Sequence, residues 1–321
     1  MLPLVSIVSP SFNKADYLEA TIKSVLEQDY PNIEYIVMDG GSTDGSVEIL
    51  RRYSDRLQWT SGPDGGQSAA VTEGWRACRG EILAEIDTSD LLAPGAVRRA
   101  VEAFETHPDW AMLYSDSAWI DEDGKQLDVV KARSFDVVDM LCGNYVPQPT
   151  VFMRKSCLDR VGYYDPRFTM SMDFDLWMRI GREFPVGYVD DAVLGLMRMH
   201  GDSKTLTSAH LWLDENVAVI DATLNFGAWT EQRARVRPAA IGCAQARHAS
   251  YCAREGRRPE ARAALWAMAR TFSLEPWRRY GRDLPQIAAQ AFLGARVAAG
   301  LRGVKGALRL SGTPVKDGRS A

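Results

Sequence analysis

The sequence predicts an α/β protein in which a mostly parallel, doubly wound sheet is followed by a helical carboxyl-terminal region. Over the first 105 residues, short β-branched apolar runs alternate with segments of helical periodicity, a pattern typical of parallel sheets covered on both faces. From residue 211 onward the periodicity is helical. The 321 residues are 46% hydrophobic and 25% charged, as in ordinary globular proteins, which excludes disordered, collagen-like and disulfide-scaffold classes.

Four strand–helix pairs are expected in the first part of the chain. The run 4–9 stops at Pro10 and precedes a helix over 16–28, in which Leu18, Ile22 and Val25 recur at helical spacing. The other predicted strands are 33–38, 57–60 and 81–86, and their helices are 45–53, 67–78 and 95–105. The carboxyl ends of these parallel strands share one edge of the sheet, where ligands bind in such folds.

The pattern changes after residue 110 and predicts a mixed part of the sheet. We expect a strand over 110–115, a hairpin around 121–124 and a strand over 150–153. A helix over 172–182 then precedes strand character over 187–199. In the carboxyl-terminal region, two Ala-rich helices over 239–253 and 259–270 are joined at Gly256, like one tetratricopeptide hairpin.

The charges divide unevenly along the chain. Residues 231–321 carry 18 Lys and Arg against 6 Asp and Glu, whereas residues 1–230 carry 20 against 36. An acidic first region repels phosphate backbones, so we expect no nucleic-acid partner. The basic region could contact anionic lipid or the acidic half itself.

Cysteine spacing and hydropathy predict a cytoplasmic protein. The five Cys lie far apart and show no metal-binding or redox spacing, which indicates free thiols in a reducing compartment. The first apolar run is too short for a secretion signal, and no stretch reaches the roughly 20 apolar residues that span a bilayer.

Polar loops follow four of the predicted strands. They cover residues 10–14, 39–44, 62–67 and 87–90, and each carries Asp, Asn, Ser or Gly. Turns need these same residue types, but four such loops at one edge favour a binding cleft. No dinucleotide-binding glycine motif, P-loop or nucleophile elbow is present, so oxidoreductase, P-loop and serine-hydrolase chemistry lose their main support.

The opening SIVSPSFNKADYLEATIKSVLEQDYPNIEYIVMDGGSTDGS resembles that of a family 2 glycosyltransferase with a Rossmann-like GT-A fold. GPDGGQSAAVTEGW, GEILAEIDTSDLLAPGAV and SMDFDLWMRIG follow in the family's order, so the resemblance covers about residues 4–205. It implies an inverting enzyme that transfers a sugar from a nucleotide-diphosphate donor to a hydroxyl of a glycan or lipid-linked glycan, in bacterial surface polysaccharide assembly. It also divides the chain into a catalytic domain over 1–210, a helical extension over 211–284 and a basic amphipathic tail over 285–321.

The resemblance assigns roles to the loop residues. Three of them would line the base and ribose pocket: Pro10, Ser11 and Asn13. Asp39 would accept a hydrogen bond from the nucleobase, Asp64 would lie on the donor side of the cleft, and Asp87 opens the family's Asp-x-Asp segment. A pyrophosphate can enter an acidic cleft only with a hard divalent cation, so the resemblance implies Mg²⁺ or Mn²⁺.

Asp87-Thr88-Ser89-Asp90 departs from the family pattern, because Ser89 stands where the principal metal-binding carboxylate is expected. Either Asp87 or Asp90 takes over, or His200 contributes, or the metal binds poorly. His200 could equally be an ordinary loop histidine. The departure keeps a rival open: a catalytically impaired nucleotide-sugar-binding or regulatory module on the same fold. A nucleotidyltransferase, which would release pyrophosphate, is a second rival.

Asp173 in Met-Asp-Phe-Asp matches the family's catalytic base, which would take the proton of the acceptor hydroxyl. A helix-capping Asp is the alternative at this position. Asp175 would orient a loop or the base, and Trp177 would pack in the core. Gln148, Pro149 and residues 162–165 could contact the acceptor or be turn residues.

The segment 285–310 has an apolar stripe with Arg and Lys elsewhere, which suits either a helix lying on an anionic membrane or packing against the catalytic domain with a frayed end. The first alternative would place the protein peripherally at the inner face of the membrane.

Overall fold

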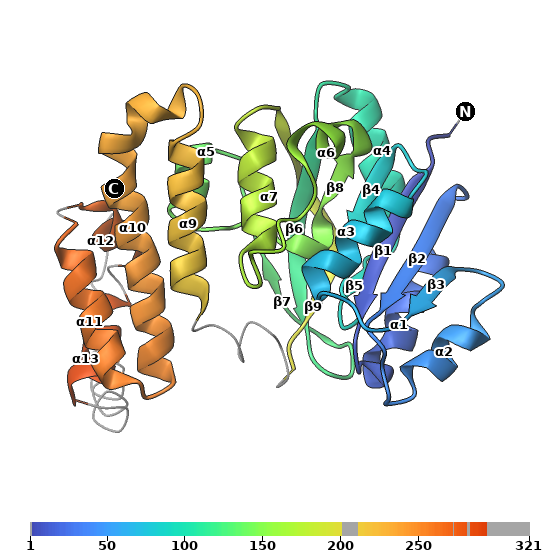
Figure 1. Ribbon diagram of the computed structural model, residues 1–321, viewed down its shortest axis with the longest axis horizontal. Coiled ribbons are helices and arrows are strands. Elements are labelled where there is room, and N and C mark those ends of the chain that lie inside the picture. Colours follow the sequence, from blue (N-terminus) through green and yellow to red (C-terminus); the bar gives the residue numbers. More distant parts are fainter. Residues whose placement is uncertain (1, 201–210, 272, 281–282, 294–321) are drawn as a thin grey trace, which may run out of the picture. The chain divides into compact units, whose positions relative to one another are not determined.

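The computed structural model describes residues 2–200, 211–271, 273–280 and 283–293 (Figure 1). The chain divides into two compact units, Met1–Trp229 and Thr230–Ala321. All predicted site residues lie in unit 1, which contains the sheet.

Unit 1 is built on a mixed sheet with strand order β3-β2-β1-β4-β8-β6-β9-β5, in which β7 also pairs with β6. The strands are β1 (Val5–Ser11), β2 (Ile33–Asp39), β3 (Gln58–Ser61), β4 (Ile82–Glu85), β5 (Leu91–Leu92), β6 (Met112–Ile120), β7 (Gln126–Val130), β8 (Phe152–Arg154) and β9 (Val186–Arg198). Strands β3, β2, β1 and β4 are mutually parallel, whereas β8 pairs antiparallel with both β4 and β6. The predicted parallel first half and mixed second half are confirmed.

The helices of unit 1 include the four predicted crossovers. They are α1 (Ala15–Leu26), α2 (Ser46–Arg52), α3 (Gln67–Ala77), α4 (Ala96–Thr106), α5 (Val137–Leu141), α6 (Lys155–Val161), α7 (Met172–Gly181) and α9 (Trp212–Leu224), with a 3₁₀ turn at Gln148–Thr150. Helices α5 and α6 were not predicted, because five and seven residues are too few to show helical periodicity.

Strand β1 is buried along its whole length, since helices cover the sheet on both sides. Helix α3 packs closely enough on it that a Cβ added at Gly74 would lie 2.6 Å from Val8 Cγ1. Trp75 is fully buried and donates its indole N–H to the Ala84 carbonyl of β4 at 3.2 Å. These contacts fix the loop before α3 at the carboxyl edge of the sheet.

Unit 2 is helical and contains α10 (Trp229–Arg254), α11 (Arg258–Ala269), α12 (Glu275–Tyr280) and α13 (Leu284–Leu293). The predicted start of the first Ala-rich helix at residue 239 is wrong, because α10 continues through Pro238 and begins ten residues earlier. The helical hairpin itself is confirmed: Gly256 joins α10 to α11 with φ of 73°. Small side chains line its core, among them Ala249, Ala253 and Ala264.

The segment predicted as a basic tail is described only as far as residue 293. There, α13 buries Leu284, Ile287 and Ala291 in the core of unit 2, so its packing partner is the helical unit and not the catalytic domain that the packing alternative named. Residues 294–310 lie outside the described residues. Within the described part of the chain, no helix is both long and apolar enough to cross a bilayer. All five cysteines are free, as the sequence predicted, and all five are buried.

Candidate active site

The carboxyl ends of β1, β2, β3 and β4 bring the predicted loops to one edge of the sheet. Ser11 pairs in register with Asp39, and Asp39 with Ser61, while Val8 pairs with Glu85 two residues before Asp87. The parallel pairing therefore aligns the residues that end three neighbouring strands, as the sequence predicted.

Asp39 anchors this edge. Its buried carboxylate accepts the N–H groups of Gly41 at 3.1 Å and Ser42 at 2.9 Å, the Ser61 hydroxyl at 2.7 Å and the Ser42 hydroxyl at 2.5 Å. Three of these four donors contact Oδ2 and one contacts Oδ1. Since each carboxylate oxygen has about two acceptor positions, Oδ1 retains capacity for one further donor. A nucleobase contact at Asp39 stays a prediction.

The loop after β1 presents an unsatisfied hydroxyl. Ser11 Oγ is buried and has no hydrogen-bond partner among the described residues. Next to it, Asn13 has φ of 50°, a left-handed conformation that Asn tolerates, and its Oδ1 accepts the Thr43 N–H at 3.0 Å. A buried hydroxyl without a partner costs free energy that a polar ligand can recover. Pro10 contributes its carbonyl, which accepts from the Thr88 hydroxyl at 3.0 Å.

Asp64 lies in an exposed loop that reaches the same edge. Its Oδ1 accepts the Gly66 N–H at 2.7 Å just before α3. A Cβ built at Gly40 would lie 3.1 Å from Asp64 Oδ2 and 3.3 Å from the Phe12 ring. The loops after β1, β2 and β3 therefore meet at Gly40, where only a residue without a side chain fits easily.

A second group of carboxylates surrounds Asp87. Gln67 Nε2 donates to Asp87 Oδ1 at 2.7 Å and lies 3.4 Å from Glu85 Oε1, while the Tyr164 hydroxyl donates to Glu85 Oε2 at 2.6 Å. Burial, followed by the neighbouring charge of Asp87, raises the pKa of both Glu85 and Asp90 to about 8. Glu85 was not singled out from the sequence. The available signal was its position at the carboxyl end of the strand that leads into the Asp87 loop.

Asp90 and His200 each contact other residues of the protein. Asp90 Oδ1 accepts the Arg198 N–H at 2.8 Å, and the centres of the His200 and Tyr17 rings lie 5.1 Å apart in a tilted arrangement. The described residues contain no group of three His, Cys, Asp or Glu side chains that could hold a metal. Asp87, Asp90 and His200 are thus not assembled into one set of ligands.

The loop of residues 87–90 is held from both sides. Thr88 binds the carbonyl of Pro10, and Arg198 Nε donates to the Ser89 carbonyl at 2.9 Å. The same Arg198 donates to the carbonyls of Asp121 at 2.9 Å and Glu122 at 2.6 Å. Arg198 therefore fixes the carboxylate loop to the hairpin between β6 and β7.

Asp173 is the second residue of α7, and the capping position belongs to Ser171. The carboxylate is half-buried and accepts from Asn144 Nδ2 at 3.2 Å and from the Phe174 N–H at 2.7 Å. Burial raises the pKa of Asp173 to about 6 against these hydrogen bonds, and the charge of Asp87 adds to the rise. The same Asp173 charge contributes to the raised pKa of Glu85, so the predicted base faces the Asp87 group.

A set of hydrogen bonds and an ion pair position α7. Glu215 of α9 accepts three N–H groups immediately before the helix, those of Thr169 at 3.0 Å, Met170 at 2.8 Å and Ser171 at 2.8 Å. Sequence reasoning missed Glu215, because nothing local marks a partner 44 to 46 residues away.

The second contact is the buried ion pair between Asp175 and Arg179, at 2.8 Å. Arg179 also donates to the carbonyls of Val161, Gly162 and Tyr163. Because Tyr164 follows directly and binds Glu85, this network connects α7 to the carboxylates around Asp87. Asp175 thus orients the loop of residues 162–165 through Arg179. In a separate contact, Gln148 Nε2 donates to the Glu85 carbonyl at 3.2 Å. Trp177 is a core residue, as predicted.

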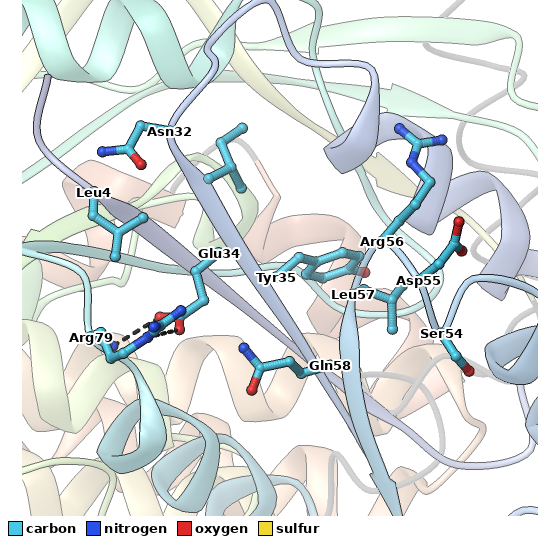
Figure 2. A pocket seen from close by; sticks show the side chains of 11 residues that line it. Leu4, Asn32, Glu34, Tyr35, Ser54, Asp55, Arg56, Leu57, Gln58 and Arg79 are labelled. Carbon is cyan, nitrogen blue, oxygen red and sulfur yellow. Dashed lines mark hydrogen bonds and ion pairs between the residues drawn. The ribbon is translucent and has the colours of Figure 1, made fainter.

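The opposite edge of the sheet carries a separate cavity of about 590 Å³ (Figure 2). It is lined by residues at the amino ends of β1, β2 and β3, including Leu4, Asn32 and Gln58. Figure 2 shows Glu34 and Arg79 pointing toward one another, and their side chains pair at 2.7 Å. Burial opposes the ionised form, but hydrogen bonds from Ser6 and Arg79 keep the pKa of Glu34 low. No predicted site residue lines this cavity.

Comparison with known sequences shows which protein family the amino-terminal part of the chain resembles. Residues 6–128 match the family described as Glycosyl transferase family 2. An uncharacterized glycosyltransferase of Rickettsia typhi is 28% identical over 225 residues, which cover 68% of this chain and 70% of that protein. The chondroitin synthase of Escherichia coli is 22% identical over 232 residues, 70% of this chain and 33% of that protein. An uncharacterized glycosyltransferase of Rickettsia conorii is matched over only 34% of its length.

Solved structures show the same fold at low identity. Staphylococcus aureus TarS 1–349 in complex with UDP-GlcNAc has a TM-score of 0.63 and 16% identity, covering 92% of this chain and 90% of that one. The mannosyltransferase PcManGT from Pyrobaculum calidifontis, in complex with GDP-Man and Mn²⁺, has a TM-score of 0.57 and 18% identity, covering 92% and 87%. The GT-A glycosyltransferase fold expected from the sequence is confirmed.

Proposed function

We propose that this chain is an inverting glycosyltransferase of family 2, because its residues 6–128 match the model of that family and its fold is that of solved glycosyltransferases. It transfers a sugar from a nucleotide-diphosphate donor to a hydroxyl of a glycan or lipid-linked glycan. A role in bacterial surface polysaccharide synthesis is supported by the similarity to a chondroitin synthase. The observation that supports the activity is that the charge of Asp87 raises the pKa of Asp173, and that both charges raise the pKa of Glu85, so the three carboxylates lie within electrostatic reach of one another.

The donor's nucleoside would bind at the ends of β1 and β2. The unpartnered Ser11 hydroxyl and the remaining acceptor position on Asp39 Oδ1 offer two polar contacts there. Asn13 and Pro10 shape the same loop, and Asp64 borders it. Structural neighbours bound to UDP-GlcNAc and GDP-Man support a uridine or guanosine diphosphate-sugar as the donor class.

A divalent cation fits the donor set around Asp87. Mg²⁺ is commonly held by one or two carboxylates together with substrate phosphates, so a complete cage of protein ligands is not required. Asp87 would be the main protein ligand, because Asp90 is committed to Arg198 and is protonated near neutral pH by its raised pKa. A bound cation supplies charge neutralisation for the departing nucleoside diphosphate.

Asp173 would act on the acceptor. As the acceptor oxygen attacks the anomeric carbon, its proton passes to the Asp173 carboxylate, and the bond from the anomeric carbon to the diphosphate oxygen breaks with its electron pair. One carboxylate suffices for this inverting displacement. Asn144 and the Phe174 N–H hold the carboxylate in place.

The experiment is the pair Asp173→Asn and Asp55→Asn. Asp173→Asn should lower transfer by about two orders of magnitude with little change in donor affinity, as expected for loss of a general base. Asp55 is an exposed carboxylate at the cavity on the opposite edge, so its variant should retain full activity. Unchanged transfer in Asp173→Asn would remove Asp173 from the mechanism.

Ser89 favours a second candidate, a nucleotide-sugar-binding or regulatory module with an impaired metal site. Ser89→Asp distinguishes the two. Increased donor hydrolysis or transfer supports an enzyme weakened by Ser89, whereas nucleotide binding without turnover in either form supports the module.

Release of nucleoside diphosphate, rather than pyrophosphate, distinguishes a glycosyltransferase from a nucleotidyltransferase.

A further inference from the structure

Helix α11 and the residue that caps its end carry a row of cations and one tryptophan, of which Arg258, Trp266 and Arg270 are exposed and Arg262 is half-buried. Arg258, Arg262, Trp266 and Arg270 follow each other at four-residue intervals, which places them on one side of the helix. The other side is apolar, since Ala261, Ala264 and Met268 pack in the core of unit 2. We call these four residues, together with Phe292, the α11 surface.

Contacts with the end of α13 hold the α11 surface together. Arg258 donates to the carbonyls of Ala291 at 3.3 Å and Phe292 at 2.6 Å, and the Arg262 guanidinium lies 5.9 Å from the centre of the Phe292 ring. Two segments that are distant in sequence therefore present one continuous surface of guanidinium groups and aromatic rings.

The apolar part of this surface is exposed. Trp266 is 63% exposed, and Phe292 and Leu293 at the end of α13 are 46% and 56% exposed. An isolated exposed apolar residue needs no explanation, but large ones gathered beside arginines are typical of interaction sites. In unit 2, Leu274 and Trp277 are exposed as well.

We propose that the α11 surface docks the protein on an anionic lipid bilayer. Charge complementarity argues for this partner, because residues 231–321 carry 18 cationic against 6 acidic side chains. Arginine is attracted to anionic headgroups, and tryptophan prefers the boundary between headgroups and acyl chains. Nucleic acid would bind the same cations, but it has no aliphatic region that could cover the exposed Leu293 beside Phe292. This inference does not depend on the proposed enzymatic activity.

The test measures sedimentation of the full-length protein with vesicles of phosphatidylcholine, with and without phosphatidylglycerol. The protein should bind only the anionic vesicles, and added salt should weaken binding. Arg262→Gln/Arg270→Gln should reduce the partition coefficient about 25-fold, because each cation near an anionic surface contributes roughly fivefold. Neither side chain belongs to the candidate active site.

The control is Arg51→Gln/Arg99→Gln, which removes two exposed cations from α2 and α4 of unit 1 and leaves the α11 surface intact. It should bind as the unsubstituted protein does. Circular dichroism of both double variants checks that they fold.

Trp266→Phe provides a second readout. Vesicles containing brominated lipid should quench the fluorescence of the unsubstituted protein more than that of this variant, because Trp266 enters the interface. Binding of an acidic oligonucleotide or protein without vesicle binding would overturn the proposal. Equal binding by Arg262→Gln/Arg270→Gln would also overturn it, because residues 294–321 would then hold the membrane instead of α11.

Discussion

At the scale of single residues, Asp173 combines two properties that a general base requires. The residue is half-buried, and its raised pKa, about 6, makes it a better proton acceptor than an ordinary Asp while leaving it ionised at neutral pH. Burial is the largest cause of the raised pKa, and the charge of Asp87 makes a smaller contribution. Both are features of the folded unit rather than of the local sequence.

A pH profile tests this property. Because the base acts only when deprotonated, kcat/KM should rise about tenfold per pH unit below about pH 6 and level off above it. Steady-state transfer assays between pH 5 and 8 measure this, with the donor-binding constant recorded separately at each pH. A profile that stays flat down to pH 5, as the ordinary Asp pKa of about 4 would give, would show that Asp173 is not the titrating base.

Asp39 permits a second prediction at this scale. Asp39→Ala should weaken nucleoside diphosphate binding about 10- to 100-fold, as expected for loss of a hydrogen bond to a charged group, and isothermal titration calorimetry measures it. Asp44→Ala is the matched control, since Asp44 accepts from Ala15 and Ser46 in the same loop but has no predicted ligand contact. Equal affinity in Asp39→Ala and the unsubstituted protein would reject the assigned role.

At the scale of secondary-structure elements, Glu215 of α9 determines where α7 begins. Three backbone N–H groups converge on one carboxylate, and they belong to the residues just before the first turn of the helix that carries Asp173. A helix start needs such acceptors, because its first N–H groups have no partner within the helix.

Glu215→Ala should therefore lower the free energy of unfolding by about 1–3 kcal/mol and reduce kcat while donor affinity stays unchanged. Glu215→Gln, which retains one acceptor oxygen, should recover part of both losses. Urea unfolding and kinetics measure the two effects. Asp214→Ala, in the same turn of α9 and exposed, is the control; an equal loss there would mean that general electrostatics, rather than the three hydrogen bonds, is responsible.

The elements that could be predicted from sequence are those with local signals. Strands β1 to β4 and helices α1 to α4 have apolar periodicity and turn residues, so the carboxylate-bearing edge follows from the chain order alone. Helix α5 and the amino end of α10 could not be predicted, because one is very short and Pro238 normally terminates a helix. The ion pairs and hydrogen bonds that connect α7 with Glu85 depend on tertiary contacts, and no local pattern indicates them.

At the scale of the whole molecule, the free cysteines allow the unfolding of both units to be followed. Cys78, Cys142 and Cys157 lie in unit 1, and Cys243 and Cys252 lie in unit 2, and all are buried. Burial also raises the pKa of Cys78 and Cys157 to about 12, which suppresses the reactive thiolate.

The native protein should therefore react with a thiol reagent only after unfolding. Absorbance of the released thiolate should account for less than about one equivalent in buffer and for all five in denaturant. Mass spectrometry of partly labelled protein then tells which unit opens first. Rapid labelling of several thiols in buffer would contradict the burial of these side chains.

The sheet order has a consequence for how the protein is made. Strand β8 lies between β4 and β6, and β9 lies between β6 and β5, so late segments complete a sheet that early segments begin. Arg198, at the end of β9, reaches back 109 residues to the Ser89 carbonyl. Contacts between such distant positions form slowly, and synthesis delivers the amino-terminal half first. On the ribosome, the loop bearing Asp87 therefore cannot make its contacts with Arg198 until the last strand has emerged, and the nascent protein completes its candidate active site only near the end of translation of unit 1.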